Sequence, residues 1–247
     1  MKTGLLLILI LLMETAFSQE EKDSYYVFDS HWQPAPKIKP AYFLRVRKES
    51  DSQFVWTYYK MYGPRIKVES FKDQKATIPN GKFAYYNESG FIDSVGHYLN
   101  GKRQGSWYYY NWNGKWIRQI DFIQGLVVRD IKNLENNKSW NDSDSLKQGE
   151  VESEFPGGQK AWLIFLNDNL HYPDRAMNAK AKGEVRITFI IDANGIVQEA
   201  DVSRSVEYSI DEEALRVISI SGQWVPATKN QVKVKSYKIQ PINFGVE

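Results

Sequence analysis

The feature that most constrains the fold is a repeat in the first half of the chain. Two adjacent tyrosines recur three times, and a glycine and then another aromatic residue follow each pair at fixed distances. The units begin 27 residues apart, from Tyr58 to Tyr85, and then 24 residues apart, from Tyr85 to Tyr109. Repetition of this kind predicts repeated structural units. The columns are Tyr58-Tyr59, Tyr85-Tyr86 and Tyr109-Tyr110; Gly63, Gly90 and Gly114; and Phe71, Tyr98 and Phe122.

Each unit is expected to form a strand, a glycine turn and a second strand. Aromatic residues favour strands, and glycine accepts the positive φ of a tight turn. A single hairpin is marginal in water, so we expect successive hairpins to pair side by side in an all-β meander. We expect the rings to pack across strands rather than to stack on glycans. The pattern resembles MORN-type repeats of the YwqK-like variant over residues 54–128, which implies a β-meander scaffold.

The N-terminus has the features of an export signal. Lys2 supplies a positive charge, Leu5–Met13 is an unbroken apolar run, and Ala16-Phe17-Ser18 fits a cleavage site that would remove residues 1–18. Nine apolar residues, at about 1.5 Å each, cover about half of a bilayer core. We therefore expect an exported protein of the periplasm or cell envelope, with retention as an inner-membrane anchor as the alternative.

Composition excludes several classes of function. There are 32 Lys and Arg residues against 30 Asp and Glu residues, so the chain lacks the basic field of a nucleic-acid binder. It has no cysteine for a disulfide or a thiolate site. His31, His97 and His171 are too far apart in the sequence to form a metal-ligand motif. With no P-loop, GxSxG or HExxH motif present, we expect neither an enzyme nor a cofactor or metal.

The remaining boundaries follow from changes in composition. Residues 19–53 are expected to be an extended lead-in with a candidate first strand at 41–46, and residues 129–150 are a polar linker. Residues 151–247 form a separate module with alternating helix and strand signals. The predicted elements are a helix after Gly157-Gly158 with Trp162 inward, a short helix at 174–181, strands at 184–192 and 196–203 around an Asn194-Gly195 turn, a helix capped by Ser209 and Glu212, and a last strand from Val232 to Ile239.

Two strands and one helix of this module have a clear apolar face. Val185, Ile187, Phe189 and Ile191 alternate on the first strand, and Ile196, Ala200 and Val202 are predicted to be in phase on the second. The helix stripe consists of Ile210, Ala214, Val217 and Ile218. This pattern predicts an α+β module, with an antiparallel sheet and helices on one face.

The order helix–strand–strand–helix–strand resembles the C-terminal domain of TonB, the energy transducer of Gram-negative envelopes, in the form found in Bacteroidota. The matching residues are Phe155-Pro156-Gly157-Gly158, Tyr172-Pro173, Gly183-Glu184-Val185, Phe189, Ile191-Asp192, Gly195, Ala214-Leu215, Trp224, Pro226-Ala227 and Pro241-Ile242-Asn243-Phe244. In that family the last strand lies at a sheet edge and pairs with an extended peptide, such as the periplasmic plug segment of an outer-membrane receptor.

Carried over, the resemblance implies that the last strand here binds a partner of the cell envelope and takes part in transport across the outer membrane. The candidate partner-binding residues are Val232, Lys233, Val234, Lys235, Tyr237 and Ile239. Lys233 and Lys235 would either attract an acidic peptide or guard an edge strand against aggregation. Trp224 is expected to pack on the core rather than anchor a partner. The alternative function is a repeat scaffold or adaptor at the envelope without a transport role, and a homodimer stays open.

Overall fold

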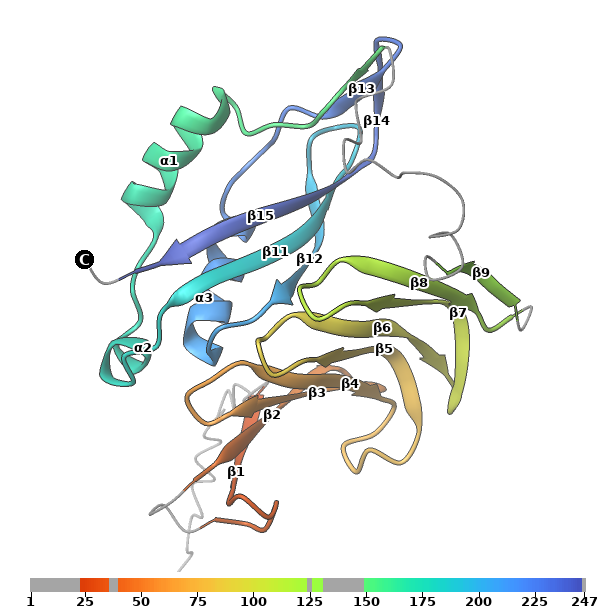
Figure 1. The fold of residues 1–247 in the computed structure, drawn as a ribbon, viewed down its shortest axis with the longest axis vertical. Coiled ribbons are helices and arrows are strands. Elements are labelled where there is room, and N and C mark those ends of the chain that lie inside the picture. The colour runs from red at the N-terminus through yellow and green to blue at the C-terminus, as the bar shows by residue number, and fades with distance from the viewer. Residues whose placement is uncertain (1–22, 36–39, 124–125, 131–148, 246–247) are drawn as a thin grey trace, which may run out of the picture.

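The computed structural model describes residues 23–35, 40–123, 126–130 and 149–245, with only the backbone described for 126–130. The predicted signal at 1–18 and most of the predicted linker lie outside these residues. Two parts are visible in Figure 1: an all-β sheet and an α+β module that stands on it. This confirms the predicted fold class.

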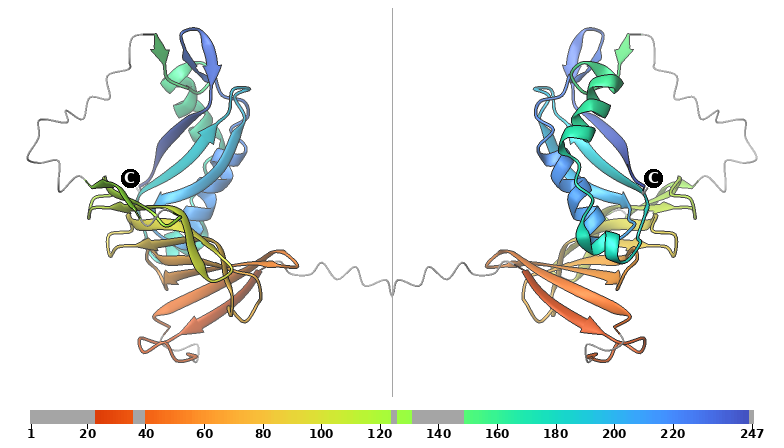
Figure 2. Two further views of the ribbon diagram at one scale, coloured as in Figure 1. Left: turned by 90° about the vertical axis from the view of Figure 1, so that its right-hand side faces the viewer. Right: turned by 90° about the vertical axis from the view of Figure 1, so that its left-hand side faces the viewer.

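The first part is a meander in which each strand pairs antiparallel with the next, in the order β1 to β9. Figure 2 shows it as one curved layer, with the C-terminal module on one side. The sheet also includes strands on both sides of the repeat, so it is wider than the repeat alone predicted. The strands are β1 (Asp23–Phe28), β2 (Tyr42–Ser50), β3 (Gln53–Lys60), β4 (Arg65–Phe71), β5 (Pro79–Tyr86), β6 (Ile92–Leu99), β7 (Lys102–Tyr110), β8 (Trp116–Asp121) and β9 (Leu126–Asp130).

The three repeat units form the hairpins β3–β4, β5–β6 and β7–β8. Gly90 and Gly114 take positive φ angles of 81° and 79° in the second and third turns. In the second turn the Asn87 side chain accepts hydrogen bonds from the N–H groups of Ser89 and Phe91. Gly63 is not among the glycines with positive φ, so the positive-φ role predicted for the glycine column holds for two of the three units.

The paired tyrosines point to opposite faces of the meander, because neighbouring residues of a strand alternate. Tyr85 and Tyr109 pack with a spine of rings on one face, whereas Tyr86 and Tyr110 pack with Val68 and Ala84 on the other. The spine crosses from strand to strand with ring centroids 4.5 to 6.1 Å apart. Its members are Trp56, Phe71, Phe83, Tyr98, Trp107 and Phe122.

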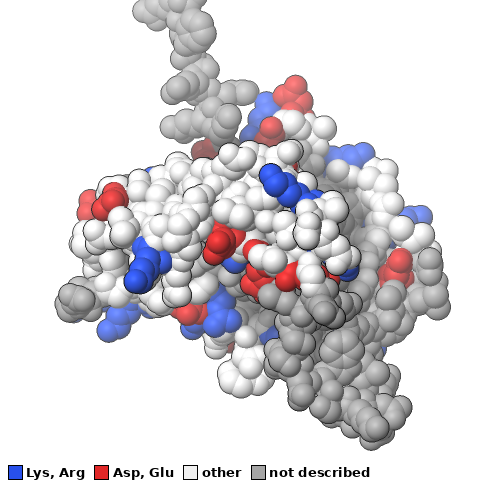
Figure 3. Space-filling view, turned by 90° about the horizontal axis from the view of Figure 1, so that it is seen from above, with Lys and Arg blue, Asp and Glu red and all other residues white. Residues whose placement is uncertain are grey.

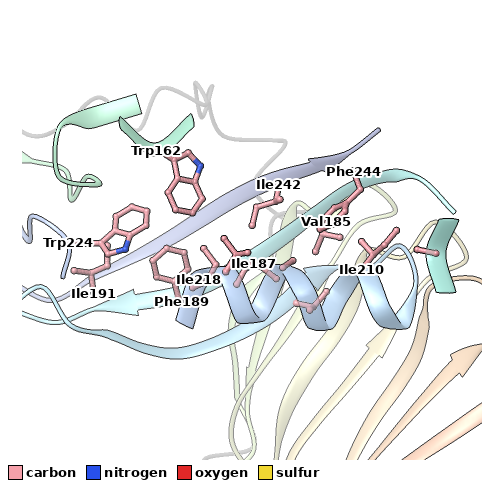
Figure 4. Close-up of a cluster of buried hydrophobic side chains, with 14 residues drawn as sticks. Trp162, Val185, Ile187, Phe189, Ile191, Ile210, Ile218, Trp224, Ile242 and Phe244 are labelled. Carbon is pink, nitrogen blue, oxygen red and sulfur yellow. The ribbon is translucent and has the colours of Figure 1, made fainter. Parts of the chain in front are cut away.

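The C-terminal module has a three-stranded antiparallel sheet in the order β12-β11-β15. Its alternating apolar residues pack with α1 and α3 around the core drawn in Figure 4. Trp162 lies in this core, as do all four residues of the predicted stripe on α3. The elements are β10 (Glu150–Val151), α1 (Gly158–Asn169), α2 (Asp174–Asn178), β11 (Gly183–Ile191), β12 (Val197–Arg204), α3 (Tyr208–Ser219), β13 (Ala227–Lys229), β14 (Val232–Val234) and β15 (Ser236–Phe244).

The predicted last strand from Val232 to Ile239 is wrong, because the structure divides it between two strands. β14 ends at Val234, and β15 begins at Ser236 and pairs with β11. Asn230 and Gln231, with φ angles of 50° and 68°, form a tight two-residue turn that folds β14 back on β13. β14 therefore belongs to a separate sheet in the order β10-β13-β14.

Two smaller predictions are also wrong. Glu199 takes a positive φ of 53° where the pairing of β12 with β11 shifts, so Ile196 falls out of phase and is exposed. The cap of α3 is Glu207 rather than Ser209, and its carboxylate accepts the Ser209 N–H. Glu212 instead points its carboxylate at Arg45 of the meander.

Candidate strand-docking edge

The meander covers the outer edge of β12 at the C-terminal end of the strand, from Val202 onward. Ser205, directly after the strand, donates its N–H to the Gly90 carbonyl at 2.9 Å. Tyr86 donates its hydroxyl to the Val202 carbonyl at 2.7 Å, and Arg204 forms an isolated bridge with Phe91. This end of the edge is therefore closed by residues of the same chain.

A buried charge network joins the two parts beside this edge. Arg65 of β4 lies 3.3 Å from the Asp211 carboxylate of α3 and 3.2 Å from the Asp201 carboxylate of β12. Asp211 also accepts hydrogen bonds from Tyr59 at 3.3 Å and Ser205 at 2.6 Å. Removing one member of such a network is costly, because the remaining charge is left buried and unpaired.

Burial and the neighbouring charges together set the pKa of the Asp211 and Asp201 carboxyl groups. Burial raises the pKa of Asp211 to about 6, while Arg65 and the hydrogen bonds from Ser205, Val206 and Tyr59 act in the opposite direction. At Asp201 burial also acts to raise the pKa, but the charges of Lys82 and Arg65 outweigh it and the pKa is lowered. At neutral pH the Asp211 carboxylate is thus a buried charge, stabilised by Arg65 and Tyr59 of the meander and by Ser205 and Val206 of the module.

Further contacts extend the interface along α3 and α2. Arg45 pairs with Glu212 at 2.9 Å, and the Tyr25 and Tyr208 hydroxyls lie 2.8 Å apart. Arg175 of α2 donates to the Met61 carbonyl. The repeat and the α+β module therefore form one continuous structure, a relation that the sequence patterns did not reveal.

The opposite edge of the same sheet, β15, has a neighbour on one side only. The direction of its main-chain groups follows from β11. Ser203 of β12 donates its hydroxyl to the Arg186 carbonyl at 3.1 Å, so the polar groups of Arg186 point toward β12. Pro241 is the β15 partner of Arg186, and its own main-chain groups therefore point away from β11.

Because this direction alternates, Tyr237, Ile239, Pro241 and Asn243 present their main-chain groups to the free edge. Tyr237 and Ile239 also expose 79% and 61% of their surface. In contrast, Ile242 and Phe244 on the same strand are buried in the core. β15 is thus anchored through one face and one edge, and it is open along the other edge.

A groove of 910 Å³ runs between α1 and β15. Trp162, Leu163 and Leu166 line it from α1, while Lys238 and Gln240 line it from β15. A second cavity of 460 Å³ continues past Tyr237 toward β10 and β13. Seen from above in Figure 3, acidic and basic side chains are mixed on this end of the molecule, without a field of one sign.

The structure brings together only part of the candidate site. Tyr237 and Ile239 lie on the open edge of β15. Val232, Lys233 and Val234 lie on β14, and Lys235 lies between the two strands.

The structure also gives the position of Trp224 and bears on metal binding and membrane spanning. Trp224 is buried and donates its indole N–H to Ser221, so it is a core residue. Within the described ranges, no group of three or more His, Cys, Asp or Glu side chains could hold a metal ion. In the same ranges, no helix has the length and apolar character needed to cross a membrane.

Comparison with known proteins supports the assignment of this module. A family model described as the C-terminal part of the Gram-negative bacterial TonB protein matches residues 168–246. No curated protein and no solved structure matches the chain. The matched residues begin at the end of α1 and include both the covered edge of β12 and the open edge of β15, and they identify this part of the chain as similar to the TonB C-terminal region.

Proposed function

We propose that this chain is an exported protein of the Gram-negative cell envelope whose C-terminal module binds a partner by strand addition to β15. One observation carries the proposal: the meander closes the end of the β12 edge from Val202 onward, while no strand of the described residues lies beside β15 on its outer edge. An extended peptide placed there would form main-chain hydrogen bonds, and its alternating side chains would supply specificity.

The surroundings of β15 suit such a peptide. On one face, the side chains of an added strand would lie beside Tyr237 and Ile239, which favour aromatic and β-branched neighbours across a strand pair. On the other face they would enter the groove beside α1, where Leu163 is largely exposed. Both faces of an added strand would therefore bury apolar surface.

We propose the periplasmic plug segment of an outer-membrane receptor as the partner, in transport that depends on TonB-like proteins. The family match over residues 168–246 and the signal at residues 1–18 support this assignment. The proposed location is the periplasm or the envelope.

The contacts of the repeats with the module favour a supporting role for the meander over the alternative of an independent scaffold. Tyr59 and Tyr86 direct their hydroxyls at Asp211 and the Val202 carbonyl of the module. We therefore propose that the meander supports the module and closes its second edge, rather than binding the envelope partner itself.

A matched pair of variants of the full chain tests strand addition. Ile239→Pro removes an outward N–H, whereas Ile239→Ala keeps it and removes only the side chain. Both are titrated with synthetic plug segments from the outer-membrane receptors of the same bacterium. We expect Ile239→Pro to weaken binding at least about tenfold more than Ile239→Ala, since main-chain bonds dominate. Equal affinity of the two variants would contradict the proposal.

A further inference from the structure

We infer that Pro241 and Gln240 close the β15 edge beyond Ile239, so that an added strand is short and is held in register at Tyr237 and Ile239. This inference rests on the proposed function, because it specifies which part of the proposed docking edge accepts main-chain bonds. It also specifies the class of partner, a short extended segment rather than a long strand.

The first observation is the missing donor. Pro241 has no N–H, and the direction of its main-chain groups places this gap on the free edge rather than toward β11. Proline is tolerated at such a position because the bond it removes is not part of the existing sheet.

The second observation concerns the acceptor at the same residue. The Gln240 side-chain amide donates to the Pro241 carbonyl at 3.3 Å. At this point the edge therefore offers no donor, and its carbonyl already has a partner. Tyr237 and Ile239 each keep an outward main-chain N–H and carbonyl. Asn243 keeps the same two groups, but Pro241 separates them from those of Ile239.

A short edge restricts what can bind. A segment of about three to five residues would use all the groups at Tyr237 and Ile239, and additional residues would find no continuous ladder. The same gap weakens pairing with a second copy of β15 along its whole length, because Pro241 would face the partner strand in each of the long registers. The occupant that fits is a short foreign segment.

The test measures binding against peptide length. Capped peptides of alternating threonine and valine, of about three, five, seven and nine residues, are titrated into the full chain and followed by fluorescence anisotropy. For the native protein we expect affinity to rise up to about five residues and then to level off. For Pro241→Val we expect it to continue rising, with about a fivefold to tenfold gain for the longest peptide, corresponding to about one added hydrogen bond.

Two controls separate this inference from the proposed function. Ile239→Pro should abolish peptide binding in both backgrounds, and peptide binding that ignores this substitution would contradict strand addition itself. If Ile239→Pro acts as expected but Pro241→Val shows the same length dependence as the native protein, only the closed-edge inference is overturned.

A second measurement needs no peptide. Sedimentation velocity over a concentration series should show stronger self-association for Pro241→Val than for the native chain, because the free edge becomes continuous. Adding Ile239→Pro to this variant should reverse the effect. Identical sedimentation of the native protein and Pro241→Val would count against the inference.

Discussion

The two edges of the C-terminal sheet differ in how their polar groups are satisfied. At β12, a backbone hydrogen bond from Ser205 to Gly90 and the buried ion pairs of Arg65 close the edge. At β15, the outward main-chain groups of Tyr237 and Ile239 have no strand beside them. Exposed edges can pair with other chains, so proteins cover them or limit them. This chain covers the end of one edge and leaves the other without a neighbouring strand.

The meander therefore has two effects on the C-terminal module. It supplies Arg65 as the cation for a carboxylate that α3 buries, and it removes the competing edge from contact with other strands. The proposed binding edge therefore depends on the contacts of the meander with β12 as well as on the residues of β15. Four experiments test this difference between the two edges, and they are described in order of decreasing expected effect.

The largest effect is expected from Arg65→Met at the closed edge. The substitution leaves Asp211 buried without its cation, which should lower the free energy of unfolding by about 3–5 kcal/mol. Urea unfolding followed by tryptophan fluorescence measures the change. Lys67→Met on the same strand is the control; its ion pair with Glu69 is partly exposed and should contribute no more than about 1 kcal/mol. Equal losses of unfolding free energy in the two variants would show that Arg65 stabilises the fold no more than a partly exposed ion pair does.

Proline substitutions at neighbouring residues test which way β15 presents its main chain. Gln240 pairs with Ile187 through groups that point toward β11, so Gln240→Pro should cost about 3 kcal/mol. Ile239→Pro removes only an outward N–H and should cost less than about 1 kcal/mol. Thermal unfolding of both variants gives the comparison. The reverse order would mean that the assigned direction of the free edge is wrong.

Two glycines with the same φ angle distinguish the cost of a clash at the interface between the meander and the module from the cost of the backbone conformation alone. Gly90 and Gly101 both have a φ of 81°. A Cβ at Gly90 would lie 2.1 Å from the Ser205 carbonyl oxygen, whereas one at Gly101 would meet nothing within 4 Å. Gly101→Ala should cost about 1 kcal/mol, and Gly90→Ala about 2 kcal/mol more because the interface must move. Similar unfolding free energies for the two variants would show that the contact between Gly90 and Ser205 can shift at little cost in stability.

The smallest effect concerns pH and Asp211. Its pKa in the folded chain, about 6, lies above its ordinary value of 3.8, so folding favours the protonated form. The stability this group contributes is fully present below pH 3.8 and is lost as the pH rises through about 6. Relative to Asp211→Asn, which does not titrate, the native protein should lose about 2 kcal/mol between pH 4 and 7. A difference that stays constant with pH would refute the shift.

Local periodicity allowed much of the fold to be predicted from sequence. The alternation on β11 and the stripe on α3 each depend on one element meeting one core, and both are buried as expected. The three hairpins followed from the spacing of tyrosines and glycines. These patterns are visible because burial imposes a period on neighbouring residues.

Contacts between residues far apart in the sequence, and a change of strand within an alternating stretch, could not be predicted in this way. Asp211 stands in the first turn of α3, where an acid commonly faces solvent and complements the helix dipole, so nothing local indicates its pairing with Arg65. The alternation from Val232 to Ile239 continues through a change of strand, and the turn at Asn230 and Gln231 lacks the usual glycine. Of the six candidate binding residues, Tyr237 and Ile239 therefore lie on the open edge of β15, while the three at 232–234 lie on β14.

Amide hydrogen exchange, read residue by residue by NMR with and without a receptor plug peptide, shows which edge of the C-terminal sheet accepts an added strand. We predict that the peptide slows exchange at Tyr237 and Ile239, which have outward N–H groups, and leaves β12 unchanged because the meander already covers that edge. Protection that appeared on β12 instead, with no change at Tyr237 and Ile239, would contradict the account.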